Sequence, residues 1–214
     1  MSSRDGVLSR IRASLAGLPD ATEGLPDHPS RAPAGERVER FAENLQAVDG
    51  QLWRADDWEQ AAGHVGRICA DADAKRGVRS NAAELDVLVH DLDLPLLAWD
   101  AAREERLAAD VGLTTAQWGI AETGTLVLVS NDEHHRLASL LPPVHVALLR
   151  TSCLLEDLGS TLAALRRDGG VSPTVTFVTG PSRTGDIELS LVIGVHGPRE
   201  LHVVLLDDGP SPQA

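Results

Sequence analysis

The sequence predicts an α/β protein in which a Rossmann-like layered sheet is covered by helices on both faces. Short runs rich in β-branched residues alternate with segments of helical periodicity over most of the 214 residues. The run 144–149 is apolar almost throughout, which is typical of a strand buried on both faces. At this length roughly 70% of the surface of the unfolded chain can be buried, so the core needs no disulfides.

The first 35 residues are predicted to form one short helix followed by a linker. Four prolines between residues 18 and 35 are incompatible with a helix or a central strand, which identifies the linker. The helix is predicted over 3–16, where apolar residues recur at helical spacing: Val7, Leu8, Ile11 and Leu15. Since so short a helix is marginal in water, we expect its apolar stripe to pack on the main domain or on another protein.

The main domain is predicted over 36–208, followed by a short tail over 209–214. Two amphipathic helices open it, at 36–48 and 56–72, and Asp56 or Asp57 is the expected N-cap of the second. The elements that follow are an extended segment near Val78, a helix at 84–90, a strand at 96–99 and a helix at 101–109.

The second half of the domain is predicted to be richer in strands. Residues 113–121 and 125–129 are expected to form two strands around a Thr-Gly turn, and a helix is predicted at 154–167. The remaining strands are predicted at 144–149, 174–179, 191–195 and 201–206. This order of strands and helices is what predicts the layered sheet.

Charge and cysteine content narrow the functional classes. A formal net charge of −13 opposes binding to a phosphate backbone, so nucleic acid is not an expected partner. Lys75 is the only lysine, which leaves few candidates for Schiff-base or P-loop chemistry. Cys69 and Cys153 belong to no CxxC pair, so this chain alone is expected to hold neither an iron–sulfur cluster nor a four-cysteine zinc. No cofactor is predicted in the chain itself.

A cytoplasmic location is predicted. Residues 1–18 carry charges throughout and lack the apolar core of a signal peptide, and no run of 18 apolar residues is present to span a membrane. Both cysteines are therefore expected to be reduced thiols in the core.

The most informative stretch is 180–188, Gly-Pro-Ser-Arg-Thr-Gly-Asp-Ile-Glu, directly after a predicted strand. A glycine turn at the carboxyl end of a strand frees backbone N–H groups, and a helix starting there would favour an anion. Ser182 and Thr184 can donate hydroxyl hydrogen bonds, and the planar Arg183 guanidinium suits a carboxylate or a phosphate. The alternative is that one of the two hydroxyls merely caps a helix with acidic residues in its first turn.

Two further polar clusters lie at predicted strand ends. Glu122 belongs to the Ala-Glu-Thr-Gly-Thr stretch at 121–125, and its carboxylate is either exposed at a hairpin end or paired in a pocket. His145 and His196 each lie at one end of a strand. A histidine there can transfer protons near neutral pH, although a hydrogen-bonded structural role is the commoner one.

The sequence lacks the motifs of several common metal, nucleotide and hydrolase sites. The eight histidines show no HExxH or similar spacing, so a metal site is not expected. The sequence has no GxGxxG after an early strand, no P-loop and no GxSxG, which argues against dinucleotide-binding, P-loop and α/β-hydrolase chemistry.

Together and in order, these motifs resemble the LUD-domain family, and within it the lactate-utilisation C type. The resemblance spans about residues 38–206 and rests on 120–125, 136–142, His145, 180–188 and 194–198. It implies a fold of the ribose-phosphate-isomerase and CoA-transferase type. It also implies a role in a bacterial cytosolic system that oxidises L-lactate to pyruvate, in which companion proteins carry the iron–sulfur clusters.

The candidate site residues fall into two groups. The candidate catalytic residues are Glu122, His145 and His196. The candidate ligand-binding residues are Thr123, Gly124, Thr125, Arg136, Gly180, Pro181, Ser182, Arg183, Thr184, Asp186 and Glu188.

Three functional hypotheses are open at this point. In the first, the chain is a subunit of a lactate-oxidising assembly, Arg183 binds a small carboxylate or phosphate, and His145 or His196 transfers a proton. In the second, it is a stand-alone isomerase or CoA-transferase-like enzyme with Glu122 as base or nucleophile. In the third, the pocket binds an anion without catalysis.

Overall fold

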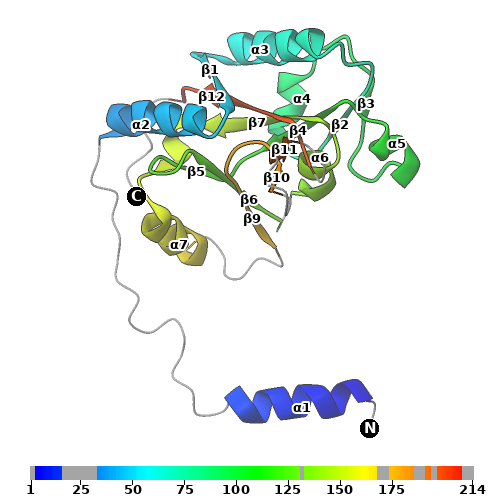
Figure 1. The fold of residues 1–214 in the computed structure, drawn as a ribbon, viewed down its shortest axis with the longest axis vertical. Helices are drawn as coiled ribbons and strands as arrows, with labels where there is room; N and C mark the ends of the chain where they lie inside the picture. Colours follow the sequence, from blue (N-terminus) through cyan, green and yellow to red (C-terminus); the bar gives the residue numbers. More distant parts are fainter. Residues whose placement is uncertain are drawn as a thin grey trace.

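In the computed structural model, a six-stranded parallel sheet forms the centre of the molecule (Figure 1). The structure describes residues 3–15, 33–130, 133–167, 174–185, 191–193 and 197–208. The six strands are β1 Gly50–Ala55, β2 Gly77–Arg79, β3 Leu96–Leu97, β4 Val111–Thr115, β7 Val144–Arg150 and β12 Glu200–Leu206. Their order is β1-β12-β7-β4-β2-β3, and every neighbouring pair is parallel.

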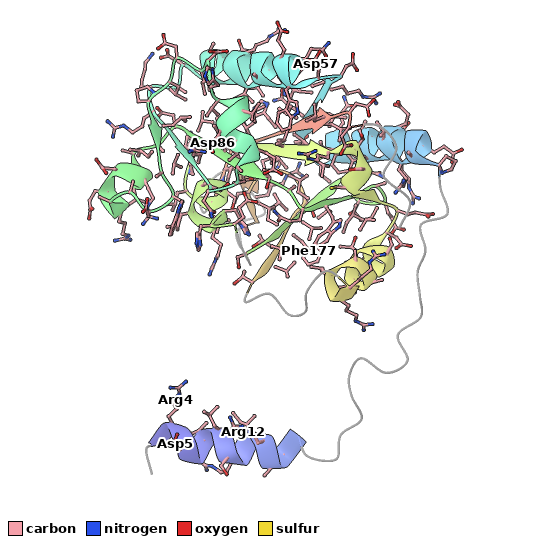
Figure 2. All side chains as sticks on the ribbon, turned by 180° about the vertical axis from the view of Figure 1, so that it is seen from behind. Arg4, Asp5, Arg12, Asp57, Asp86 and Phe177 are labelled. Carbon is pink, nitrogen blue, oxygen red and sulfur yellow. The ribbon has the colours of Figure 1, made fainter. Side chains whose placement is uncertain are left out.

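One face of this sheet is covered by α3 Trp58–Asp71 and α4 Glu84–Leu88. Val65 and Ile68 of α3 are buried in one cluster with Leu113 of β4 and Val146 of β7. The start of α3, marked by Asp57 in Figure 2, is capped because the Asp57 side chain accepts a hydrogen bond from the Gln60 backbone N–H at 2.8 Å. The expected N-cap of this helix is confirmed.

The opposite face is covered by α2 Ala34–Ala47, α6 Arg136–Leu140 and a second sheet. The second sheet has the order β8-β5-β6-β9, from Leu154–Leu155, Trp118–Ile120, Thr125–Val129 and Val175–Val178. Phe41 and Leu45 of α2 are fully buried between the two sheets. Helix α7, Leu158–Arg167, packs on the second sheet through Leu165. The predicted α/β class, a central parallel sheet flanked by helices, is confirmed.

The second sheet corrects the sequence prediction in two places. The strand expected at 113–121 is two strands in different sheets, since the Ala116 N–H bonds to Leu148 O of the central sheet and the Gln117 N–H to Val127 O of the second. The helix expected from residue 154 begins at Leu158, because residues 154–155 form β8 and Asp157 accepts a hydrogen bond from the Ser160 N–H at 2.7 Å.

The segment after β9 also differs from the prediction. Arg183–Gly185 is strand β10, which pairs antiparallel with β11 Leu191–Ile193, so the described residues hold no helix start after Gly180. Strand β9 is antiparallel to β6, so the carboxyl-end rule for parallel sheets does not apply to this turn. The anion-binding contribution expected from a helix N-terminus is therefore wrong for the described residues.

The remaining helices are α1 Ser3–Leu15, α5 Arg103–Leu107 and the 3₁₀ turn Thr151–Cys153. The predicted N-terminal helix is confirmed as α1, with Val7 and Ile11 exposed. Most of the predicted linker and the tail lie outside the described residues. Within the described ranges, no helix combines the length and the apolar character that crossing a bilayer requires.

Candidate functional site

Two of the sequence motifs pack against the carboxyl end of α2. Gly124 ends the β5–β6 turn with φ 63°, and a Cβ added there would lie 2.3 Å from the backbone nitrogen of Leu45. Gly180 follows β9 with φ 79°, and an added Cβ would lie 2.2 Å from the carbonyl oxygen of Val48. Positive φ and backbone contact both require glycine. The two turns therefore dock on the same helix end, although 55 residues separate them.

A chain of threonine hydroxyls joins these two motifs directly. Thr123 Oγ1 lies 2.7 Å from Thr125 Oγ1, which in turn lies 2.8 Å from Thr179 Oγ1. Thr179 immediately precedes Gly180 and was missed by sequence reasoning. The predicted ligand-binding residues Thr123 and Thr125 thus hydrogen-bond each other and fasten the 121–125 turn to the 179–183 turn.

Glu122 lies at the exposed end of the β5–β6 hairpin. Its side chain is half exposed, and its carboxylate is 3.8 Å from the Arg40 guanidinium. Its backbone N–H donates to Glu156 O at 3.0 Å, which places the backbone but leaves the carboxylate outward. Exposed ion pairs of this kind contribute little to stability. Of the two expectations for Glu122, the exposed hairpin end is the one that the structure shows.

Arg183 forms an ion pair with Asp49. Asp49 lies in the turn between α2 and β1 with φ 62°, a conformation that Asp tolerates better than most residues. Sequence reasoning missed Asp49, although the Asp-Gly pair at 49–50 is a turn signal. The guanidinium that was expected to bind an anion therefore already has a carboxylate partner from this chain.

A cavity of about 190 Å³ lies beside the 179–183 turn, at the amino ends of β7 and β12. It is bounded by α6, β9 and the turn that follows β9. His145, Gly180 and Ser182 are the predicted site residues that line it. The Ser182 N–H donates to Pro198 O at 2.8 Å, which ties the 180–188 motif to the 194–198 motif. Residues distant in the sequence thus converge on one hollow, which we call the motif cavity.

Among the described residues that line the motif cavity, His145 is the one with a titratable side chain. It is fully buried, its Nε2 lies 2.9 Å from Thr114 Oγ1, and its Nδ1 has no hydrogen-bond partner within the described part of the chain. Burial lowers the pKa of His145 to about 3, and the nearby His135 and His202 act in the same direction. His145 is therefore neutral near pH 7 and can share a hydrogen bond with a ligand, but it is a weak base.

The other predicted residues are scattered. Arg136 is exposed at the first residue of α6, next to the fully buried His135, whose pKa is lowered by burial. Pro181 is buried, and the backbone of Thr184 belongs to β10. The residues Asp186, Glu188 and His196 lie outside the described part of the chain. In the described part, the motif cavity therefore offers hydroxyl groups, backbone groups and a neutral imidazole.

The fold and this hollow define a mixed α/β protein with a small cavity at the amino edge of its parallel sheet. The model of the LUD domain family matches residues 38–206, and the chain belongs to that family. The resemblance drawn from the motifs is confirmed.

Several relatives are known. The chain is 42% identical over 113 residues to lactate utilization protein C of Exiguobacterium sp., covering 51% of this chain and 49% of that protein. It is 35% identical over 123 residues to the protein of the same name from Bacillus subtilis, covering 53% and 51%. The chain thus spans about half the length of these two curated relatives.

Two other proteins match over most of their length. An uncharacterised protein of Neisseria meningitidis serogroup B is 31% identical over 229 residues, covering 99% of this chain and 97% of that protein. A crystal structure of a DUF162 family protein from Deinococcus radiodurans superposes with a TM-score of 0.62 at 21% identity, covering 82% of this chain and 99% of that chain. At this identity the likeness supports the fold.

Proposed function

We propose that this chain is a cytoplasmic subunit of a system that oxidises L-lactate to pyruvate together with iron–sulfur partner proteins. The observation that carries the proposal is the match of half the chain, at 35–42% identity, to proteins named lactate utilization protein C. Oxidation of lactate to pyruvate releases two electrons and two protons. In this proposal the electrons pass to clusters held by the partner proteins, and this chain contributes a binding site.

The ligand proposed for the motif cavity is a small carboxylate or phosphate. A volume of about 190 Å³ is below the roughly 300–1,000 Å³ of sites for drug-sized ligands, so it suits a small molecule. The Ser182 hydroxyl and the backbone of the 179–183 turn would hydrogen-bond the anion. Arg183 would join them by exchanging Asp49 for the ligand, and neutral His145 would hydrogen-bond the ligand hydroxyl. His196 is the proposed proton acceptor.

Co-purification tests the assembly role. A tag is added to the chromosomal copy in the native host, and proteins recovered from lactate-grown cells are identified by mass spectrometry and by the electron paramagnetic resonance of reduced clusters. We expect cluster-containing proteins in the eluate, and loss of growth on L-lactate but not on pyruvate after deletion of the gene. Recovery of the chain alone, with unchanged growth of the deletion strain on L-lactate, would refute the proposal.

Calorimetric titration with L-lactate, pyruvate and inorganic phosphate tests the ligand. Ser182→Ala removes a hydroxyl that lines the motif cavity, and Ser152→Ala, on the 3₁₀ turn after β7, is the matched control. We expect only Ser182→Ala to weaken binding, by about tenfold or more, since a hydrogen bond to a charged group contributes about 1.5–3 kcal/mol. Equal affinities for the two variants would place the ligand elsewhere.

A further inference from the structure

A larger cavity, of about 650 Å³, lies at the carboxyl edge of the central sheet, the edge opposite to the motif cavity. Its lining includes Thr115 at the end of β4, Arg150 at the end of β7, and the segment 81–84 that follows β2. It shares no lining residue with the motif cavity. Its volume falls inside the range for sites that hold a drug-sized molecule or a cofactor. We call it the carboxyl-edge cavity.

The chain path explains why the sheet opens at this position. From β2 the chain runs through α4, on one face, to the edge strand β3. From β4 it runs through the second sheet and α6, on the other face, to β7. The connections that leave the neighbouring strands β2 and β4 thus run in opposite directions along the sheet and cover opposite faces. Such a switch point is where open α/β sheets place their ligands.

The buried carboxylate of Glu133 links the ends of strands β2 and β4. Glu133 is 7% exposed and lines the carboxyl-edge cavity. Its oxygens accept hydrogen bonds from the Ser80 hydroxyl after β2, the Thr115 backbone N–H at 3.0 Å, the Thr115 hydroxyl, and the Gln117 amide at 2.7 Å. With four donors on two oxygens, the carboxylate is saturated. Glu133 is thus a positioning residue that fixes the floor of the cavity.

Arg150 supplies the positive charge of the cavity lining. Its closest carboxylates are Glu84 at 3.6 Å and Asp208 at 3.9 Å, both beyond the usual hydrogen-bond distance. Its guanidinium carbon lies 5.5 Å from the centre of the Trp58 ring, a distance at which the ring attracts the cation. The Trp58 ring therefore positions the guanidinium. Because its ion pairs to Glu84 and Asp208 are long, a ligand carboxylate can replace them with bidentate hydrogen bonds.

We infer that the carboxyl-edge cavity binds an organic acid with an apolar body larger than that of lactate. The acid group pairs with Arg150, and the apolar body lies against Ala116, Trp118 and Leu148, which line the same cavity. Glu84 competes with this ligand for the guanidinium. Two opposite effects follow: loss of Arg150 weakens binding, and loss of the Glu84 charge strengthens it.

The test uses 2-naphthoate as the probe and the neutral 2-naphthamide as its uncharged counterpart, both titrated by fluorescence into the full chain. Arg150→Gln is expected to weaken naphthoate binding by at least about tenfold, the equivalent of one charge-assisted hydrogen bond, with naphthamide nearly unaffected. Glu84→Gln is expected to strengthen naphthoate binding by about two- to fivefold. Arg54→Gln, which removes an exposed guanidinium paired with Glu39, is the matched control and leaves both probes unchanged.

A further variant guards against a folding artefact. Ala83 is exposed and lines the cavity, so Ala83→Phe blocks it without a change in the core and is expected to abolish binding of both probes. Ser182→Ala, in the motif cavity, leaves naphthoate binding intact, so the outcome is independent of the proposed lactate role. Absence of saturable naphthoate binding to the parent chain, or equal affinities for Arg150→Gln and Arg54→Gln, would overturn the inference.

Discussion

At the scale of single residues, the burial of His145 links folding to pH. An unfolded histidine has a pKa of 6.5, whereas burial lowers the pKa of folded His145 to about 3. Below pH 6.5 the unfolded chain therefore binds a proton that the folded chain does not. The stability due to the neutral ring is fully present above pH 6.5 and is lost as the pH falls toward 3, at about 1.4 kcal/mol per pH unit.

We therefore predict that His145→Gln flattens the pH dependence of stability. The variant is expected to be less stable at pH 8 by about 1–3 kcal/mol, because it disturbs a buried hydrogen bond to Thr114. Between pH 6.5 and 4 its free energy of unfolding should fall less steeply than that of the parent. Urea titrations at four pH values measure both slopes. Since His135 and His202 are present in both proteins, parallel curves would show that His145 is not the linked group.

Glu133 provides a second prediction at the residue scale. Glu133→Gln replaces one acceptor oxygen by an NH₂ group, which then faces donors on Ser80, Thr115 or Gln117. A buried donor without an acceptor costs about 1–3 kcal/mol, so the free energy of unfolding should fall by that amount. Glu39→Gln, at an exposed carboxylate whose pKa is lowered by hydrogen bonding to Arg54, should lower the free energy of unfolding much less, because water screens this ion pair. Similar losses for both variants in urea denaturation would contradict this role.

At the scale of elements, the carboxyl end of α2 is held by two glycine turns. We predict that Gly124→Ala and Gly180→Ala each lower the free energy of unfolding by about 2 kcal/mol or more. Each has a positive φ, which alone costs about 1–2 kcal/mol in alanine, and the new methyl group would meet backbone atoms of α2 or its cap. Gly63→Ala, in helix α3 with no atom within 4 Å of the added carbon, is the control and should stabilise by about 0.5–1 kcal/mol.

Comparison of the predicted with the observed elements shows which features of the fold local sequence patterns can predict. Local signals predicted the helices that contain Phe41 and Val65, the Asp57 cap and the buried strand at 144–149. The assignment of strands to two sheets was missed, because apolar runs look alike in a parallel sheet and in an antiparallel one. The switch at Ala116, between β4 and β5, depends on hydrogen bonds to Leu148 and Val127, which are contacts between segments distant in the chain.

The structure brings some of the predicted site residues together and shows partners that sequence patterns missed. The glycine and threonine motifs have recognisable local spacing. Thr125 and Thr179 join them in the structure, and Gly180 lines the motif cavity together with His145. Asp49, which binds Arg183, lies in an Asp-Gly pair that indicates only a turn, and Glu133, which ties β2 to β4, lies in a stretch without a motif. Their partners are 134 and 53 residues away or at a neighbouring strand end, so only the folded topology reveals them.

At the scale of the whole molecule, the parallel sheet separates two cavities. The motif cavity lies at the amino edge beside His145, and the carboxyl-edge cavity lies at the other end of the same strands beside Arg150. Strand β7 contributes to both, since His145 is its second residue and Arg150 its last. Binding of the ligands proposed for the two edges is therefore expected to respond independently to substitutions at Ser182 and Arg150.

The N-terminal helix supplies the last prediction, also at the scale of the whole molecule. Val7 and Ile11 of α1 are 44% and 49% exposed. Burial of these two side chains against a partner would therefore stabilise the complex. Deletion of residues 1–32 is expected to change the free energy of unfolding by less than about 0.5 kcal/mol. The same deletion should reduce the recovery of the proposed iron–sulfur partners in co-purification. Val7→Ser together with Ile11→Ser should reproduce that loss in the full-length chain, whereas Ser9→Ala, on the same helix, should not. A fall in stability above about 1 kcal/mol on deletion would instead mean that α1 packs on its own domain.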